Sequence, residues 1–322
     1  MIEALHDVQA PAGVQAQALY HLWLVLLGVC SVVFVAVMAA LAVALRRAPR
    51  GGPDTPPRIE LLERREPAVA RPVMIAVAVS TVLLLGLLGA SVYTSRALAG
   101  MPLTDALHID LTAHQWWWEV RYDDAEPSRV FVTANELHVP VGRPVLLTLR
   151  ASDVIHSFWV PSLVGKKDLI PGREATVAFR ADRAGVYRGQ CAEFCGYQHA
   201  KMALFVIADA PDAWQRWAER QRAPAAAPRT SQEARGRELF ESGTCAMCHA
   251  VAGTRAGGRH APDLTHVASR RTLAAGAIPN DVAARTAWIV DPQAIKPGVN
   301  MPATRLAPED AAAITAFLGG LE

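Results

Sequence analysis

The stretch GQCAEFCGYQHAKM, residues 189–202, places four soft metal ligands close together. They are Cys191, Cys195, His199 and Met202. Thiolate, imidazole and thioether ligands favour copper, whereas magnesium and calcium prefer oxygen. A mononuclear blue-copper site uses one Cys, two His and a weak axial Met, but here a second Cys follows the first after three residues. Two sulfurs so close together can bridge two copper ions.

A second imidazole for such a pair is available upstream, at His156 in the segment SDVIHSFWVP. With it the sequence resembles subunit II of cytochrome c oxidase, whose binuclear copper A centre has the pattern C-x-E-x-C-x3-H-x2-M after an earlier D-V-x-H-S. Every position of this pattern is filled. The resemblance implies that Cys191 and Cys195 supply two bridging thiolates and that His156 and His199 supply one imidazole for each copper. Met202 would be a weak thioether ligand, and Glu193 would contribute its backbone carbonyl.

Two other interpretations of the cysteine pair remain open. A C-x3-C loop can hold a disulfide, which is the default for an isolated pair in an oxidising compartment. A thioredoxin-like copper-delivery protein also uses C-x3-C and a histidine, but there the histidine lies far downstream, whereas His199 follows Cys195 after three residues. The complete ligand pattern favours the copper centre.

Two long apolar segments precede these motifs. Residues 19–45 contain no charged residue, and 27 helical positions would span about 40 Å, more than the ~30 Å hydrocarbon core of a bilayer. The second predicted transmembrane helix is 72–95, of which the first 22 positions alone reach about 33 Å. A signal peptide is the alternative for the first segment, but the segment is too long and lacks a preceding basic region.

The distribution of positive charge predicts how the two transmembrane helices are oriented in the membrane. The loop 46–71 contains seven arginines, whereas residues 1–18 contain no Lys or Arg. The positive-inside rule then predicts a cytoplasmic loop and an external N-terminal segment, with both termini outside. Cys30 is interpreted as a small residue facing lipid or a neighbouring helix. Two helices bury little surface by themselves, so we expect a larger membrane partner.

In residues 105–210 the apolar residues recur with a period of two. Leu107, Ile109 and Leu111 alternate with polar residues, and turn signals such as Pro171-Gly172 separate further segments of this kind. About a hundred such residues predict an antiparallel β-sandwich. The family resemblance specifies a cupredoxin-like Greek-key domain with the metal loops at one end.

The segment HQWWWEVRYDD contains three adjacent tryptophans, which cannot all face one core because neighbours in a strand point to opposite sides. At least one is therefore expected near the surface. The resemblance implies that Trp116 lies beside the copper at the docking surface for cytochrome c, as the site of electron entry. For Trp117 and Trp118, the alternative is bracing against the membrane interface.

The resemblance also implies groups that act toward a neighbouring subunit. The Glu193 carboxylate is a candidate ligand of a magnesium ion shared with subunit I, and Asp168 is a weaker candidate. A glutamate near the inner end of the second helix feeds a proton channel in the family, and Glu60, Glu63 and Glu66 are the candidates here.

Residues 211–230 begin polar and helical and then become rich in Ala and Pro, which is typical of a semi-rigid linker. After it comes CAMCH, the C-x-x-C-H motif by which two thiols attach a c-type haem and the adjacent histidine reaches the iron. This motif predicts a haem c held by Cys245, Cys248 and His249.

The sixth haem ligand is expected to be Met301. Within residues 231–322 the other methionine, Met247, lies between the attaching cysteines and cannot reach the opposite haem face. KPGVNMPAT and APDLTHV resemble class I cytochrome c, an all-α fold in which such a methionine is the distal ligand. His260 and His266 are alternatives, interpreted as loop histidines. His/Met ligation gives a relatively high potential and leaves no open site, so this domain should carry electrons.

Together these features predict an electron-entry subunit of a proton-translocating respiratory oxidase. Electrons from an external c-type cytochrome would pass through haem c and copper A to haem a of subunit I, where oxygen is reduced to water; subunit III is a further expected partner. We expect a multi-pass protein of the cell's inner (plasma) membrane, embedded in lipid, with both redox domains on the periplasmic side. A membrane-tethered copper-delivery protein is the alternative, and a quinol oxidase subunit would lack the copper ligands. A net charge of +2 gives no support for nucleic-acid binding.

Overall fold

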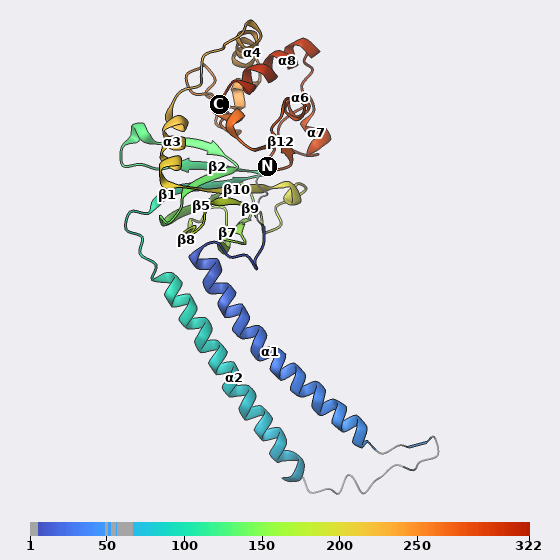
Figure 1. Ribbon diagram of the computed structural model, residues 1–322. Helices are drawn as coiled ribbons and strands as arrows, with labels where there is room; N and C mark the ends of the chain where they lie inside the picture. The colour runs from blue at the N-terminus through green and yellow to red at the C-terminus, as the bar shows by residue number, and fades with distance from the viewer. Residues whose placement is uncertain (1–5, 49–50, 53–55, 57–66) are drawn as a thin grey trace. The chain divides into compact units, whose positions relative to one another are not determined.

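The computed structural model describes residues 6–48, 51–52, 56 and 67–322 (Figure 1). Two long helices, α1 (Val14–Arg47) and α2 (Pro67–Ala99), are long and apolar enough to cross a membrane. Each contains an 18-residue stretch of high mean hydropathy, 2.9 in α1 and 2.5 in residues 70–99 of α2. Nearly all of their apolar side chains are exposed, as lipid-facing helices require. The proton-channel candidates Glu60, Glu63 and Glu66, and most of the arginine-rich loop, lie outside the described residues.

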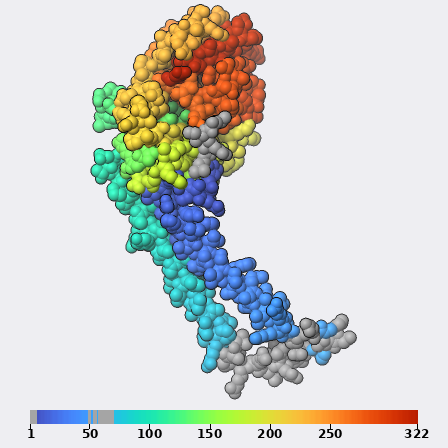
Figure 2. Space-filling model, in the orientation of Figure 1, coloured from blue at the N-terminus to red at the C-terminus, as the bar shows by residue number. Residues whose placement is uncertain are grey.

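The contacts divide the chain into two compact units, residues 18–101 and the remainder. Within the second unit we call residues 105–210 the copper domain and residues 231–322 the cytochrome domain. The space-filling view shows the orange and red atoms of the cytochrome domain lying directly on the green and yellow atoms of the copper domain (Figure 2).

Three sheets make up the copper domain. The first has the strand order β3-β2-β1-β5-β8, the second has β4-β10-β9, and the third pairs β6 with β7. The strands are β1 (Leu107–His114), β2 (Trp117–Tyr122), β3 (Phe131–Ala134), β4 (Glu136–Pro140), β5 (Val145–Ala151), β6 (His156–Val160), β7 (Val164–Leu169), β8 (Ala175–Phe179), β9 (Gly185–Gln190) and β10 (Ala203–Asp209).

The sheets are mixed, so the expectation of a purely antiparallel sandwich was wrong. β1 pairs with β5 in parallel, from Leu107 opposite Val145 onward, and β4 pairs with β10 in parallel. Alternation within a strand shows which face is buried, but it carries no information on the direction of the neighbouring strand. Both parallel pairs join strands that are distant in the chain, because parallel neighbours need a long crossover connection.

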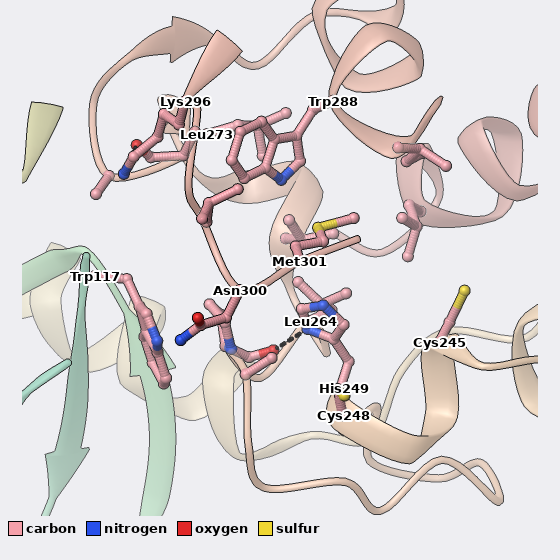
Figure 3. Close-up of a pocket in the computed structure, with 18 of the residues that line it drawn as sticks. Trp117, Cys245, Cys248, His249, Leu264, Leu273, Trp288, Lys296, Asn300 and Met301 are labelled. Atoms are coloured by element: carbon pink, nitrogen blue, oxygen red, sulfur yellow. Dashed lines mark hydrogen bonds between the residues drawn. The ribbon is translucent and has the colours of Figure 1, made fainter. Parts of the chain in front are cut away.

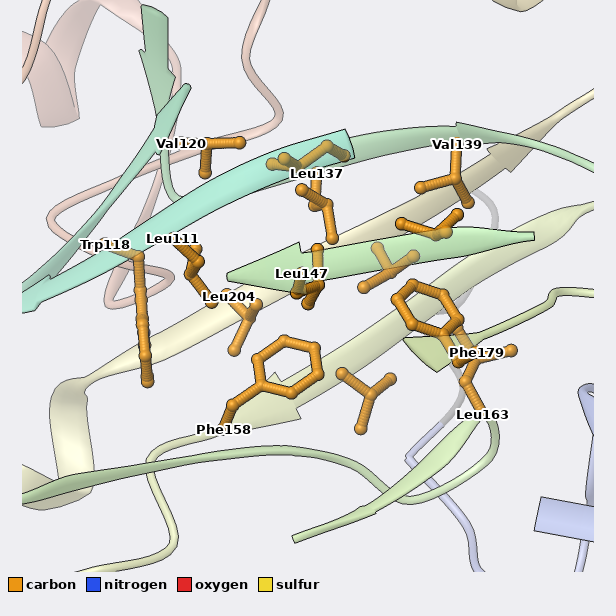
Figure 4. Packing of buried hydrophobic residues seen from close by; sticks show 14 of the residues in the cluster. Leu111, Trp118, Val120, Leu137, Val139, Leu147, Phe158, Leu163, Phe179 and Leu204 are labelled. Carbon is orange, nitrogen blue, oxygen red and sulfur yellow. The ribbon is translucent and has the colours of Figure 1, made fainter. Parts of the chain in front are cut away.

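The core of the copper domain lies between the sheets (Figure 4). Leu111 of β1, Leu147 of β5 and Phe158 of β6 are fully buried, as are Trp118 and Phe179. The period-two pattern therefore places the expected apolar residues inside. This core supports the loop that follows β5 and the loop that follows β9, which contains the short 3-10 helix η3 (His199–Lys201).

The chain before α1 is fastened to the copper domain. The Ala12 amide donates to the Ser162 carbonyl at 2.7 Å, and the Asp182 amide donates to the Ala12 carbonyl at 2.8 Å. A Cβ on Gly13 would lie 2.6 Å from the Arg180 carbonyl oxygen, so only glycine permits this close approach. Residues 6–17 thus belong to the same compact unit as the copper domain.

Helix α3 (Pro211–Arg222) occupies the first part of the segment expected to be a linker. Its Trp214, Trp217 and Ala218 side chains are buried in the core of the copper domain. The Trp217 ring stacks on His138 with centroids 4.1 Å apart. The extended connection to the next helix is confined to residues 223–230.

The cytochrome domain is helical, in agreement with the sequence. Thr230 caps helix α4 by accepting the Glu233 amide, in a T-x-x-E capping box. Gly236 allows α4 to pack tightly on α8, because an added Cβ would lie 2.0 Å from the Ala313 carbonyl oxygen. The elements are α4 (Ser231–Ser242), α5 (Cys245–Cys248), η4 (Val267–Ser269), β11 (Thr272–Leu273), β12 (Ile278–Pro279), α6 (Val282–Val290), α7 (Pro292–Ile295) and α8 (Pro308–Gly319).

Candidate copper and haem sites

The cysteine loop folds back on itself and gathers the ligands expected for copper. The Cys191 and Cys195 sulfurs lie 3.7 Å apart. His156 Nδ1, at the start of β6, lies 3.8 Å from the Cys191 sulfur, and His199 Nδ1 lies 3.5 Å from the Cys195 sulfur. The Met202 sulfur is 3.8 Å from the Cys195 sulfur. One loop and one strand end therefore bring all five side chains together.

The Glu193 backbone carbonyl also reaches this group, at 3.2 Å from the Cys191 sulfur. Its carboxylate and that of Asp168 are exposed. Among the described residues, the one cluster of three or more His, Cys, Asp or Glu ligands is formed by His156, Cys191 and Cys195, whose ligand atoms lie within 4.8 Å of one another. Neither carboxylate belongs to it.

The sulfur geometry fits metal ions and not a disulfide. An S–S bond is about 2.05 Å long, and the 3.7 Å separation leaves both cysteines free. Ligands bound to one ion at about 2.0–2.3 Å lie roughly 3–4 Å from one another, which matches the separations found here. The donor set of this site thus fits copper in chemistry and in spacing.

The pKa values of the two cysteines also favour a metal site. Contact with the Cys195 thiol lowers the pKa of Cys191, and contact with Cys191, together with burial, raises the pKa of Cys195. The first thiolate therefore forms easily, but a second one beside it is strongly disfavoured. Two thiolates this close become stable only when cations lie between them.

His156 is oriented by the carboxylate of Asp153, a residue of the segment SDVIHSFWVP that was not among the expected site residues. Asp153 Oδ1 lies 2.8 Å from His156 Nε2, and Asp153 Oδ2 accepts the Gln115 amide at 2.6 Å. Burial tends to lower the pKa of His156, but the contacts with Cys191 and Asp153 outweigh burial and raise it. A carboxylate on the second ring nitrogen commonly fixes a metal-binding imidazole, and its place three residues before the histidine was the available signal.

Two further side chains brace the loop at the Cys195 carbonyl. Gln115 Nε2 donates to this oxygen at 2.7 Å and Trp116 Nε1 donates at 2.8 Å. Trp116 is only 6% exposed and Trp118 is fully buried, whereas Trp117 is half-buried and stacks on the His114 ring at 4.3 Å. The three rings thus do not all face one core, but the most exposed of them is Trp117.

The residues of the haem motif line a cavity of about 650 Å³ (Figure 3). One turn of helix, α5, carries Cys245 and Cys248, and His249 follows at its end. His249 Nδ1 donates to the Pro262 carbonyl at 2.7 Å, so that Nε2 is left to act as a ligand. Burial lowers the pKa of His249 and favours the neutral, metal-binding imidazole.

Met301 reaches the same cavity from a different segment, as Figure 3 shows. Gln293 Nε2 holds its loop by donating to the Val299 carbonyl at 2.8 Å and to the Met301 carbonyl at 2.9 Å. Met247 is 71% exposed. His266 uses both ring nitrogens on backbone carbonyls, those of Glu322 and Ala223, and is not available as a ligand.

Polar groups around the cavity fit a haem as well. Arg270 Nε, Thr272 Oγ1 and Arg285 Nε are buried without a hydrogen-bond partner, and all three residues line the cavity. Buried donors of this kind are costly to leave unpaired. The two propionates of a haem would supply anionic acceptors for them, so the residues present fit the group that the motif implies.

The two sites adjoin each other. The haem cavity is also lined by Gln115 and Trp116, the two residues that brace the Cys195 carbonyl. Hydrogen bonds cross between the domains nearby: the Ala203 amide donates to the Ala275 carbonyl at 2.9 Å, and Gln198 Nε2 donates to the Pro297 carbonyl at 2.6 Å. A single layer of side chains therefore separates the haem cavity from the copper loop.

Comparisons with known proteins identify the families of the two domains. Residues 124–209 match the family model "Cytochrome C oxidase subunit II, periplasmic domain", and residues 233–322 match "Cytochrome c". Cytochrome c oxidase subunit 2 of Alkalihalophilus pseudofirmus is 33% identical over 319 residues, covering 97% of this chain and 90% of the relative. The Bacillus subtilis protein of the same name is 34% identical over 234 residues, covering 69% and 64%.

A solved structure is also similar. The periplasmic domain of subunit II of the Bradyrhizobium japonicum cytochrome oxidase is 31% identical, covering 36% of this chain and 92% of that one, with a TM-score of 0.34.

Proposed function

The chain belongs to the cytochrome c oxidase subunit II family and carries a C-terminal cytochrome c domain, so it serves electron transfer into a terminal oxidase. From this premise we propose that it takes electrons at a covalent haem c and delivers them through copper A. When bound, the two cofactors supply one-electron chemistry, by which electrons from an external c-type cytochrome reach haem a of subunit I for proton-coupled reduction of oxygen to water.

The observation that carries this proposal is the position of the two sites. The ligand set of His156, Cys191, Glu193, Cys195, His199 and Met202 lies next to the cavity of Cys245, Cys248, His249 and Met301, inside one compact unit. Trp116 lines the cavity and donates to the Cys195 carbonyl. We therefore assign Trp116 to the path between the sites rather than to an exposed docking surface.

This assignment moves the docking of the external donor to the cytochrome domain. At 6% exposure, Trp116 is covered by residues of that domain, among them Lys296, which donates to its carbonyl. An external cytochrome reaching the copper loop would have to displace this cover. We propose that it reduces the haem from another side of the cytochrome domain.

We further propose the membrane arrangement and the remaining partners. Helices within 19–45 and 72–95 cross the inner membrane, the loop 46–71 is cytoplasmic, and residues 1–18, the copper domain 105–210, the connection 211–230 and the cytochrome domain 231–322 lie on the periplasmic side. The exposed Glu193 carboxylate is available for a magnesium ion shared with subunit I, and subunit III completes the complex.

Cofactor analysis and spectroscopy of the purified chain test the proposal. We expect two coppers and one covalent haem per chain, and an electron paramagnetic resonance signal from one unpaired spin shared equally by two coppers. Cys191→Ser should abolish this shared-spin signal, while Cys30→Ser, the matched control outside the site, should leave it unchanged. One labile copper per chain would instead favour copper delivery.

A further inference from the structure

Lys296 stands apart from the other lysines. Lys166, Lys167 and Lys201 are exposed, whereas Lys296 is 1% exposed. Its ammonium donates to the Trp116 carbonyl of the copper domain at 2.9 Å and to the Ala274 carbonyl of the cytochrome domain at 3.1 Å. One side chain therefore connects the two domains through backbone oxygens.

No acidic group compensates this charge within the part of the chain that the structure describes. Burial, with a smaller contribution from the charge of Lys201, lowers the pKa of Lys296 to about 7, and the Cys195 sulfur is the one group that raises it. A buried ammonium without a carboxylate is costly. An apolar side chain would fill the same space, so the position calls for an explanation beyond packing.

The neighbouring contacts show what the lysine holds in place. Residues 295–297 lie between the haem cavity and the copper loop, and their carbonyls accept hydrogen bonds from that loop: Lys201 Nζ donates to Ile295 at 2.5 Å and Gln198 Nε2 to Pro297 at 2.6 Å. The Lys296 side chain itself reaches the Trp116 carbonyl, and both residues line the cavity. Figure 3 shows Lys296 at the edge of this cavity.

We propose that Lys296 is a positioning residue that seats the haem cavity against Trp116 and the copper loop, and that its charge favours the reduced haem. This inference rests on the proposed electron-transfer function. The two carbonyl bonds fix the distance between the redox sites, and a buried cation beside the cavity stabilises an added electron.

Hydrogen exchange on the full-length chain tests the positioning role without relying on activity. Lys296→Met keeps the apolar stem but removes the donors. We expect the Ala203 amide, which bonds across the domain interface, to exchange about tenfold faster, as the loss of hydrogen bonds to buried carbonyls predicts. The β1 amides inside the copper domain should be unchanged and report that the domain is folded. Unchanged Ala203 protection would overturn the proposal.

Two further variants separate charge from contact. Lys296→Gln keeps two N–H donors without the charge. We expect protection of the Ala203 amide within about threefold of the original chain, but a lower haem reduction potential at pH 6, where Lys296 is charged because its pKa is about 7. Lys167→Met is the matched control, an exposed lysine on β7 of the copper domain, and should change protection and potential little. An equal effect of Lys167→Met, or an unchanged potential in both Lys296 variants, contradicts the assignment.

The rate of electron transfer from haem to copper after flash reduction completes the test. We expect Lys296→Met to slow it by at least about tenfold, since the distance between the sites is no longer fixed. If the original chain shows no such transfer, the proposed function fails, while the exchange experiment still decides the positioning role. A normal rate despite faster Ala203 exchange would show that positioning by Lys296 is not needed.

Discussion

At the level of single residues, spacing carries most of the information about the copper ligands. Cys195 and His199 are four positions apart, as are Cys191 and Cys195, so one tight loop brings them together. Trp116 is different. Its expected place at a docking surface rested on the family resemblance, but the Lys296 ammonium that covers its carbonyl comes from 180 residues further along the chain. No local pattern could predict that contact.

Asp153 yields a prediction at this scale. Asp153→Asn keeps the size of the side chain but removes the charge that holds His156 Nε2. We expect copper affinity to fall by roughly 10–100-fold, as is usual when the partner of a metal-binding histidine is lost. The measurement is a competition titration of the full-length chain against a copper chelator.

Asp123→Asn is the matched control for this experiment. Asp123 lies in the same domain and pairs with Arg121 at 2.9 Å on the surface, where such a pair contributes little. Its copper affinity should stay within about twofold of the original. Equal affinities for the Asp153 and Asp123 variants would mean that Asp153 does not orient the ligand.

At the level of helices and strands, apolar length predicted the two long helices, a period of two predicted the β-rich domain, and the family resemblance predicted the helical C-terminal domain. All three are confirmed. The parallel pairings of β1 with β5 and of β4 with β10 were missed, because pairing direction depends on contacts between distant strands. Helix α3 looked like part of a linker because its composition is polar, yet Trp214 and Trp217 bury one face in the copper domain.

The packing of α4 against α8 gives a prediction for an element. Gly236→Ala should lower the free energy of unfolding of the cytochrome domain by about 1–3 kcal/mol, because the new Cβ would lie 2.0 Å from the Ala313 carbonyl oxygen. The gain of up to about 1 kcal/mol that alanine offers in a helix offsets only part of this cost, because the new contact is with a backbone atom that cannot move aside easily. Thermal unfolding followed by haem absorbance measures it.

Gly257→Ala serves as the control in the same domain. An added Cβ at Gly257 meets no atom within 4 Å, so the change in stability should stay within about 0.5 kcal/mol. If the Gly236 variant proves as stable as this control, the helices do not pack as closely as described.

At the level of the whole molecule, the contact between the domains is what the sequence leaves open. Each domain could be predicted from its own motif, since ligand spacing and periodicity are local. The hydrogen bond from the Ala203 amide to the Ala275 carbonyl joins segments that share no pattern. The N-terminal contact is of the same kind, since Ala12 and Asp182 carry no signal that they meet.

The N-terminal contact leads to a prediction about topology. Because residues 12–16 are bonded to the copper domain, residue 8 must lie on the same side of the membrane as that domain. Val8 is 56% exposed, so Val8→Cys in spheroplasts should react with a membrane-impermeant maleimide, well above the unsubstituted chain. Gly51→Cys, in the arginine-rich loop between the helices, should react only after permeabilisation, since positive charge retains that loop in the cytoplasm. Labelling of the Gly51 variant in intact spheroplasts, with protection of the Val8 variant, would invert the proposed topology and place the copper domain inside the cell.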